Sequence, residues 1–184
     1  MVFARIEGWL DRYFGKGHGI GIATTESAAH SKDPMVRALW YASHLGTWAD
    51  HGVRVFTPWG WTDEMWEVLH LFSRYAGTVR ISTSTTGEPL VSAYASVAAD
   101  GKALTVFLVN RDTVARDAEV AVENFNVGKG PVTTLALAGV PANTLTFKSH
   151  RRNALRRGTA RLAGGRVRAA LRPRSITALL IPAR

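Results

Sequence analysis

The stretch Gly19-Ile20-Gly21-Ile22-Ala23-Thr24-Thr25-Glu26 decides how the first half of the chain folds. Its apolar run has the length of a buried parallel strand and lies between glycines and polar residues. A second run of this kind, Val53-Arg54-Val55-Phe56-Thr57, ends at Pro58-Trp59-Gly60-Trp61. The two runs predict parallel strands that end on a carboxylate and on indole rings.

Helical patterns flank both predicted strands. Apolar side chains recur at three- and four-residue spacing over residues 3–14. Asp33-Pro34 begins a second helix, with Asp as N-cap and Pro at the first helical position, and this helix ends near Gly52. Thr62-Asp63-Glu64 begins a third helix, which ends near Gly77. Alternation of helix and strand predicts right-handed crossover units and a parallel sheet, open or closed into a barrel.

From Thr78 onward the pattern changes to short alternating or apolar runs, several of them separated by turns such as Asp100-Gly101. Seven or so strands at this spacing indicate an antiparallel β-sandwich. The predicted fold class is therefore α/β followed by all-β, with residues 1–77 and 78–184 as two domains packed directly on each other. We expect the strands of the second domain at residues 79–82, 90–97, 104–109, 118–122, 132–137, 166–171 and 176–181.

Composition excludes several classes of protein. The 184 residues contain no Cys, which rules out a disulfide scaffold, a Cys nucleophile and a thiolate metal site. The six histidines show no pair at ligand spacing with a carboxylate partner, so we expect no metal and no cofactor. No apolar run reaches the roughly 18 residues of a membrane-spanning helix. The first residues also lack the basic-then-apolar order of a signal peptide.

The net charge of +9 arises in the second half of the chain, where residues 76–184 carry sixteen Lys/Arg against six Asp/Glu. Arginines crowd residues 151–174, and no acidic residue follows Glu123. Single-stranded nucleic acid sites usually add aromatic platforms to such a cluster, but no aromatic residue follows Phe147. A solvated strand surface rich in Arg is therefore expected here rather than a nucleic-acid site.

Thr24-Thr25-Glu26 and Phe56-Thr57-Pro58-Trp59-Gly60-Trp61 together resemble the ends of the seventh and eighth strands of a clan A glycoside hydrolase barrel. The chain is most similar to the cellulase and xyloglucanase type of family 44, in which a TIM barrel is followed by a β-sandwich ending on a run like Ser175-Ile176-Thr177-Ala178-Leu179-Leu180-Ile181. This resemblance implies that residues 1–77 are the carboxyl-terminal part of a (β/α)8 barrel. It also implies a retaining endo-β-glucanase, acting on plant-type polysaccharide and secreted as part of a longer protein.

The resemblance makes Glu26 the catalytic nucleophile. A carboxylate at the carboxyl end of a barrel strand lies on the face where barrel active sites form. The alternative role for this residue is a surface carboxylate in a loop. Trp59 matches the family's sugar-stacking Trp, whereas Trp61 is explained equally well by packing. Thr25 and His30 complete the candidate substrate-binding set, although His30 is more simply a loop histidine.

The resemblance also implies a missing catalytic partner. An eight-stranded barrel takes about 250 residues, and only two predicted strands precede the sandwich. In the family the acid/base Glu lies on the fourth strand, so the chain alone should be weak or inactive. An incomplete barrel exposes strand edges and apolar helix faces, which invites self-association or a complementing amino-terminal barrel chain.

Two other functions stay open from the sequence. One is a non-catalytic carbohydrate-binding or interaction module, with the sandwich as its stable unit. The other is a basic nucleic-acid-binding module, whose affinity would fall steeply with salt.

Overall fold

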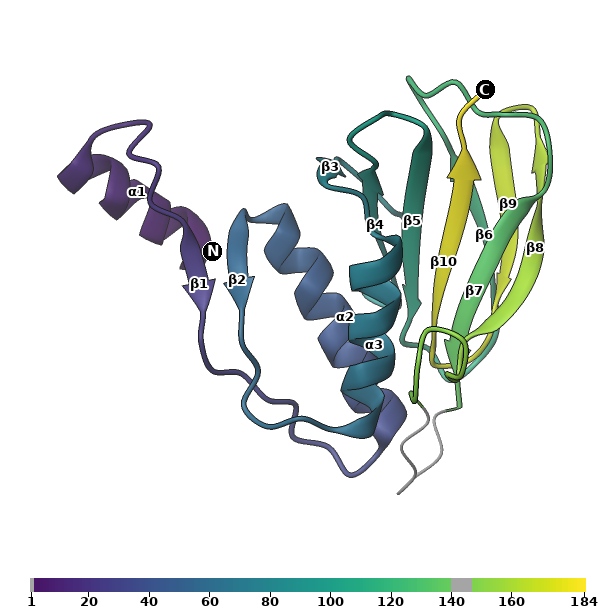
Figure 1. Cartoon of the computed structure of the whole chain (residues 1–184), viewed down its shortest axis with the longest axis horizontal. Helices are drawn as coiled ribbons and strands as arrows, with labels where there is room; N and C mark the ends of the chain where they lie inside the picture. Colours follow the sequence, from purple (N-terminus) through teal and green to yellow (C-terminus); the bar gives the residue numbers. More distant parts are fainter. Residues whose placement is uncertain (1, 140–146) are drawn as a thin grey trace.

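The computed structural model describes residues 2–139 and 147–184, and Figure 1 shows how their elements are arranged. The first half contains α1 (Val2–Phe14), β1 (Ile22–Thr24), α2 (Pro34–Asp50), β2 (Val53–Phe56) and α3 (Asp63–Tyr75). The second half contains β3 (Val79–Ile81), β4 (Val91–Val97), β5 (Ala103–Asn110), β6 (Arg116–Ala121), β7 (Val132–Ala138), β8 (Arg156–Ala163), β9 (Arg166–Leu171) and β10 (Ser175–Pro182). Every helix and strand expected from the sequence is present, and β8 is an additional strand.

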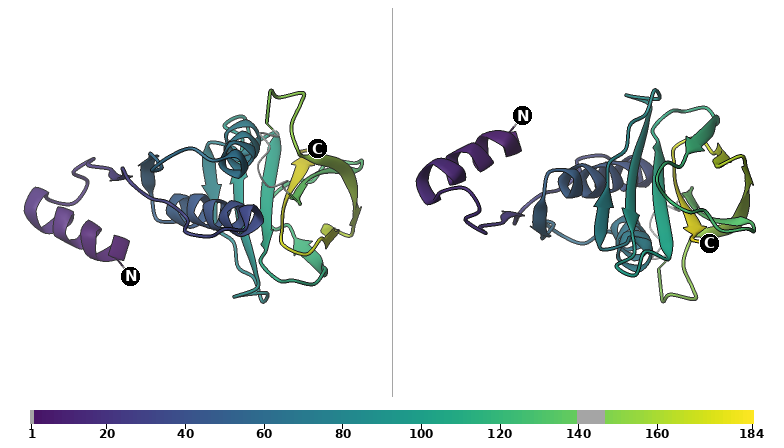
Figure 2. Two further views of the ribbon diagram at one scale, coloured as in Figure 1. Left: turned by 90° about the horizontal axis from the view of Figure 1, so that it is seen from below. Right: turned by 90° about the horizontal axis from the view of Figure 1, so that it is seen from above.

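The strands of the second half form one antiparallel sheet in the order β3-β4-β5-β10-β7-β8-β9-β6. The sequence predicts a sandwich for these strands, and the structure joins them in one ladder that is continuous from one edge to the other. Strand β8 provides the continuity, because Arg156–Ala160 pair with β7 and Arg161–Ala163 pair with β9. The sheet curls until its two ends face each other, as the end-on views in Figure 2 show. Residues of β4, β5 and β6 consequently line one cavity of about 840 Å³.

Both faces of the central strands are buried. Alternate side chains of a strand point to opposite faces, and in β5 one set lies inside the curl while the other set faces α2 and α3. Such two-sided burial accounts for the nearly continuous apolar run of β5, whose last seven residues are all buried. Side chains that join the helices to the sheet include Leu39, Met65, Val68, Leu71, Phe107, Val109, Leu135, Leu137 and Ile176.

The first elements of the chain lie apart from this core. Strands β1 and β2 form a separate two-stranded parallel sheet in which Ile22 is opposite Val53 and Thr24 is opposite Phe56. Helix α1 contains no buried residue and projects beyond β1, at the far end of the molecule from the main sheet (Figure 1). No helix among the described residues is long and apolar enough to cross a membrane.

Candidate functional site

The parallel pairing of β1 and β2 brings the candidate catalytic and sugar-binding residues together. Two backbone hydrogen bonds of 2.9 Å continue the pairing past the strand ends, from Thr57 to the carbonyl of Thr24 and from Trp59 to the carbonyl of Ser27. Parallel strands end at the same edge of a sheet, so the two following loops run side by side. Glu26 precedes Ser27 and is therefore close to Trp59 in the fold.

The side chains at this edge are open to solvent. Glu26 and Thr25 are exposed, and Trp59 keeps 69% of its surface accessible. The carbonyl of Thr25 accepts a 2.7 Å hydrogen bond from the hydroxyl of Thr57, which fixes the backbone beside Glu26. His30 is also exposed and lies four residues further along the same loop. The structure thus groups Glu26, Thr25 and Trp59 at one edge, with His30 in the loop that follows.

Trp61 packs against another indole rather than beside Trp59. An extended strand would point both rings the same way, but Gly60 between them has a left-handed φ of 76°, which turns the chain. Trp61 stacks on Trp66, with ring centroids 4.4 Å apart and ring planes 21° apart. Both indoles remain partly open, at 54% and 38% exposure. No local pattern in the sequence predicts this stack, although Trp66 lies in the first turns of α3.

A buried ion pair holds the loop that carries Glu26. Glu64 on α3 is 1% exposed and accepts hydrogen bonds from Arg37 on α2, at 2.5 and 3.1 Å. The hydroxyl of Thr62 donates to the same carboxylate at 2.5 Å. Arg37 also donates to the carbonyl of Ser31 at 2.6 Å. One guanidinium therefore ties both helices to the loop between β1 and α2.

The hydrogen bonds of this network keep the carboxylate of Glu64 ionised. Burial acts to raise the pKa of Glu64, but hydrogen bonds from Arg37 and Thr62 outweigh it, and the pKa lies below its ordinary value. Burial raises the pKa of Tyr41, while hydrogen bonds to the backbone of Ala29 and to Thr62 partly oppose the rise. Tyr41 thus stays a neutral phenol that gives the loop a second attachment point.

The N-terminus of α2 supplies a third attachment. Asp33 accepts hydrogen bonds from the backbone amides of Met35 at 2.8 Å and Val36 at 3.4 Å, as expected for an N-cap. Its other carboxylate oxygen accepts a 2.7 Å hydrogen bond from Arg174, in the turn before β10. The loop from Glu26 to Asp33 is therefore anchored to α2, α3 and the main sheet, which limits how far Glu26 can move.

A second polar cluster lies where α3 meets the connection between β7 and β8. His70 is 3% exposed, and its Nδ1 lies 3.2 Å from Nδ1 of His150. Burial lowers the pKa of His70, and electrostatic interactions with His150 and Arg74 lower it further. Glu67, one helical turn before His70, accepts a 2.9 Å hydrogen bond from the amide of Ala154. This cluster fastens the connection to the helix.

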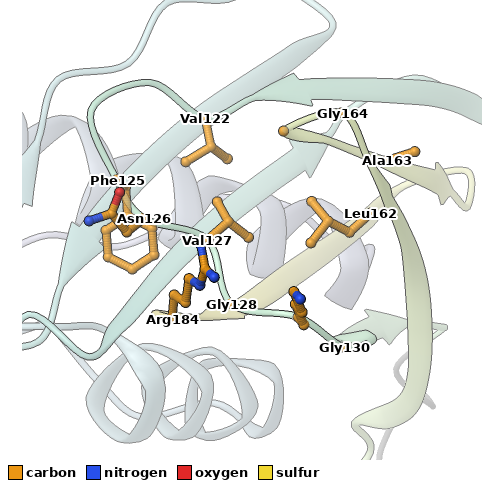
Figure 3. Close-up of a pocket in the computed structure, with 12 residues that line it drawn as sticks. Val122, Phe125, Asn126, Val127, Gly128, Gly130, Leu162, Ala163, Gly164 and Arg184 are labelled. Carbon is orange, nitrogen blue, oxygen red and sulfur yellow. The ribbon is translucent and has the colours of Figure 1, made fainter.

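A shallow cavity of about 580 Å³ opens at the end of the curled sheet (Figure 3). It contains none of the candidate site residues and is lined mainly by apolar side chains and glycines, with Lys129 and Arg184 among the rest. Among residues 2–139 and 147–184 no group of three or more His, Asp or Glu could hold a metal ion. The β1–β2 edge is thus the only place in the described chain where the predicted catalytic and stacking residues meet.

Several solved structures of enzymes contain a region with the fold of this chain. Over its full length the chain superimposes on CelM2, a bifunctional glucanase-xylanase from a metagenome library, with a TM-score of 0.82 and 23% identity. A family 44 xyloglucanase from Paenibacillus polymyxa gives 0.80 at 15% identity, again over the whole chain. The family 44 endoglucanase Cel44A from Clostridium thermocellum gives 0.77 at 15% identity, over 98% of the chain.

The matched part is a minor share of each of these enzymes. The chain spans 34% of CelM2, 36% of the xyloglucanase and 35% of Cel44A. Neither a protein-family model nor a curated protein matches the sequence. At these identities the likeness is one of fold. The chain therefore has the fold of about a third of a family 44 cellulase or xyloglucanase, as its two strand-end motifs predict.

Proposed function

We propose that this chain is the carboxyl-terminal part of a retaining glycoside hydrolase that acts on a β-glucan, with Glu26 as nucleophile. The observation that carries the proposal is the position of Glu26 at the carboxyl end of a parallel strand, hydrogen-bonded at the backbone to the segment of exposed Trp59. Barrel enzymes form their active sites at this end of the strands. In this proposal β1 and β2 are the last two strands of a TIM barrel and residues 78–184 are its β-sandwich.

The chemistry follows from one exposed carboxylate beside an indole. A carboxylate oxygen of Glu26 attacks the anomeric carbon, forming a glycosyl ester while the bond to the leaving oxygen breaks. A protonated carboxyl about 5–5.5 Å away gives its proton to that oxygen, and water then hydrolyses the ester. The exposed face of Trp59 packs on the C–H face of the sugar and orients it for attack. Thr25 shapes the backbone around the nucleophile.

The proton donor lies, in this proposal, on a part of the barrel outside these 184 residues. Loss of general-acid assistance costs typically about 10²–10⁴ in rate, so the chain alone should hydrolyse natural glucans weakly or not at all. A complementing chain or a longer protein would supply the donor and most substrate contacts. We also propose that this longer protein works outside the cell, where its polymeric substrate lies.

The test is release of reducing sugar from carboxymethylcellulose and xyloglucan, with Glu26→Gln beside the wild-type chain. Glu7→Gln on α1 is the matched control, because it removes the same charge from a half-exposed position away from the strand ends. We expect trace activity that is lost in Glu26→Gln and kept in Glu7→Gln. Equal, measurable activity in all three proteins would show that Glu26 is not the nucleophile.

A carbohydrate-binding role without catalysis is favoured by one observation, the exposure of Trp59, Trp61 and Trp66 within eight residues of chain. Indoles exposed in this way can bind glucan without any carboxylate chemistry. Isothermal titration with cello-oligosaccharides distinguishes the two functions. Binding that needs Trp59, with no covalent chemistry at Glu26, would favour the binding module.

A further inference from the structure

Four arginines share the outer face of the β8–β9 hairpin, at the opposite end of the molecule from β1 and β2 (Figure 1). The inner face is set by Val167 and Leu162, which pack inside the curled sheet. Because side chains alternate along a strand, the residues between them point outward. These outward residues are exposed, and the arginines among them, here called the arginine face, are Arg157, Arg161, Arg166 and Arg168.

The arginine face holds like charges directly opposite each other. Arg161 on β8 is paired in register with Arg168 on β9, and like charges in this arrangement destabilise a sheet. Glu119 on β6 accepts hydrogen bonds from Arg166 at 2.6 Å and from Arg168 at 2.7 Å. One carboxylate thus serves two guanidinium groups. No ion pair within the described residues involves Arg157 or Arg161.

Glu119 also orders the face. Hydrogen bonds from Arg168 and then Arg166 hold the pKa of the Glu119 carboxyl below its ordinary value. The carboxylate therefore stays charged at neutral pH and keeps both guanidinium groups in place. A guanidinium binds a carboxylate through two parallel hydrogen bonds, and an added carboxylate between Arg161 and Arg168 would remove their repulsion. The face is arranged for an extended anion that carries several carboxylates.

We propose that the arginine face binds carboxylated polysaccharide, that is, a chain bearing uronic acid groups. The polysaccharide nature of this partner rests on the proposed function, whereas its negative charge rests on the arginines alone. Strands β8 and β9 carry no aromatic residue, so the face lacks the stacking platforms of single-stranded nucleic acid sites. The arginine face would bind the acidic polysaccharide of a cell wall, while the β1–β2 edge acts on the glucan of the same wall.

The test is fluorescence anisotropy of labelled polygalacturonate titrated with the chain at low and high salt. We expect binding at about 50 mM NaCl that weakens at least about tenfold by about 300 mM, since added salt screens exposed charges. Unlabelled xyloglucan, a neutral polymer, should not compete. Glu26→Gln should bind as wild type does, so loss of the proposed catalysis and loss of this binding are separate results.

Paired variants assign the binding to the face. Arg161→Gln/Arg168→Gln should weaken binding about tenfold or more. Its melting temperature should change little, because removal of the like-charge pair offsets the loss of the exposed Arg168–Glu119 ion pair. The matched control Arg5→Gln/Arg12→Gln makes the same charge change on exposed α1 and should bind within about twofold of wild type. Equal weakening in the two double variants, competition by xyloglucan, or tighter binding of a single-stranded DNA oligonucleotide would overturn the proposal.

Discussion

Helices α1 and α3 have the same length, 13 residues, and both are amphipathic, yet only α3 is part of a core. Helix α3 buries six residues against α2 and the main sheet, whereas α1 buries none. The apolar face of α1 instead leaves Trp9, Tyr13 and Phe14 more than half exposed. An amphipathic pattern thus forms a helix in both places. The helix adds to the stability of the fold only where its apolar face packs against another element.

The difference extends to the candidate site. Glu64 on α3, through Arg37 on α2, holds the loop that follows Glu26. Helix α1 precedes β1 without any comparable buried contact. Stability and site geometry should therefore depend on α2 and α3 and hardly at all on α1, and the following variants test this contrast.

Leu71→Ala should have the largest effect. Leu71 lies on α3 and is completely buried in the core between the helices and the sheet. Truncation of such a side chain costs about 2–5 kcal/mol of unfolding free energy. Phe14→Ala on α1, where the ring is 64% exposed, should change it by less than about 0.5 kcal/mol. Urea unfolding followed by circular dichroism measures both. A similar loss in the two variants would contradict the contrast.

Arg37→Met should come next, at about 2–3 kcal/mol, because it leaves the buried Glu64 carboxylate without its cation. In wild type the lowered pKa of Glu64 adds stability that is present above its unfolded-state pKa, about 4.5, and is lost as the pH falls through the folded-state pKa. The variant should lose this acid-side dependence. Unfolding free energies at pH 7 and below pH 4.5 provide the measurement, and an unchanged pH slope would refute the assignment.

Glycines on α1 and α2 differ in the space around them, and substituting each by alanine tests the same contrast. A Cβ at Gly46 of α2 would lie 2.3 Å from the Tyr94 ring, whereas a Cβ at Gly8 of α1 meets nothing within 4 Å. Gly46→Ala should destabilise the protein by about 1–3 kcal/mol through overpacking. Gly8→Ala should increase helicity, since Ala is favoured over Gly by about 1 kcal/mol in a helix. Thermal melts together with far-ultraviolet circular dichroism would separate these effects, and a stabilising Gly46→Ala would count against close packing of α2 on β4.

The smallest effect should be a pH dependence from His70. Its lowered pKa means that the unfolded chain binds a proton more readily than the folded chain. Stability should therefore fall as the pH drops below the unfolded-state value of about 6.5, by roughly 1 kcal/mol per unit until the folded-state pKa is reached. His70→Gln should flatten this part of the profile. Burial lowers the pKa of His44 as well, so His44→Gln is the parallel variant. If His70→Gln leaves the dependence of unfolding free energy on pH unchanged, His70 does not contribute to it.

Local signals in the sequence predicted much of the fold. The Asp33-Pro34 cap and the glycine stops located the helices, and the short apolar runs located β1 and β2. Strand β8 was missed because its Arg-rich sequence gives a weak alternating pattern with few apolar residues. Its role in joining β7 to β9 is also the reason that the sheet is continuous rather than divided.

Long-range contacts of the candidate site could not be predicted in the same way. Arg37 and Glu64 lie 27 residues apart, and no local pattern links a cation on one helix to an anion on the next. The juxtaposition of Glu26 and Trp59 was predictable because parallel strands end at one edge. The Trp61–Trp66 stack was not, since it depends on the left-handed turn at Gly60.

The most direct test of the account is covalent trapping of Glu26. A 2,4-dinitrophenyl 2-deoxy-2-fluoro-β-cellobioside releases a leaving group that needs no protonation, so the nucleophilic step is tested without any requirement for a general acid. Mass spectrometry of the digested chain should find the fluoroglycosyl ester on Glu26, with none on the Glu26→Gln protein. An adduct on another residue, or no adduct in a folded chain that binds the sugar, would contradict the assignment of Glu26 as nucleophile.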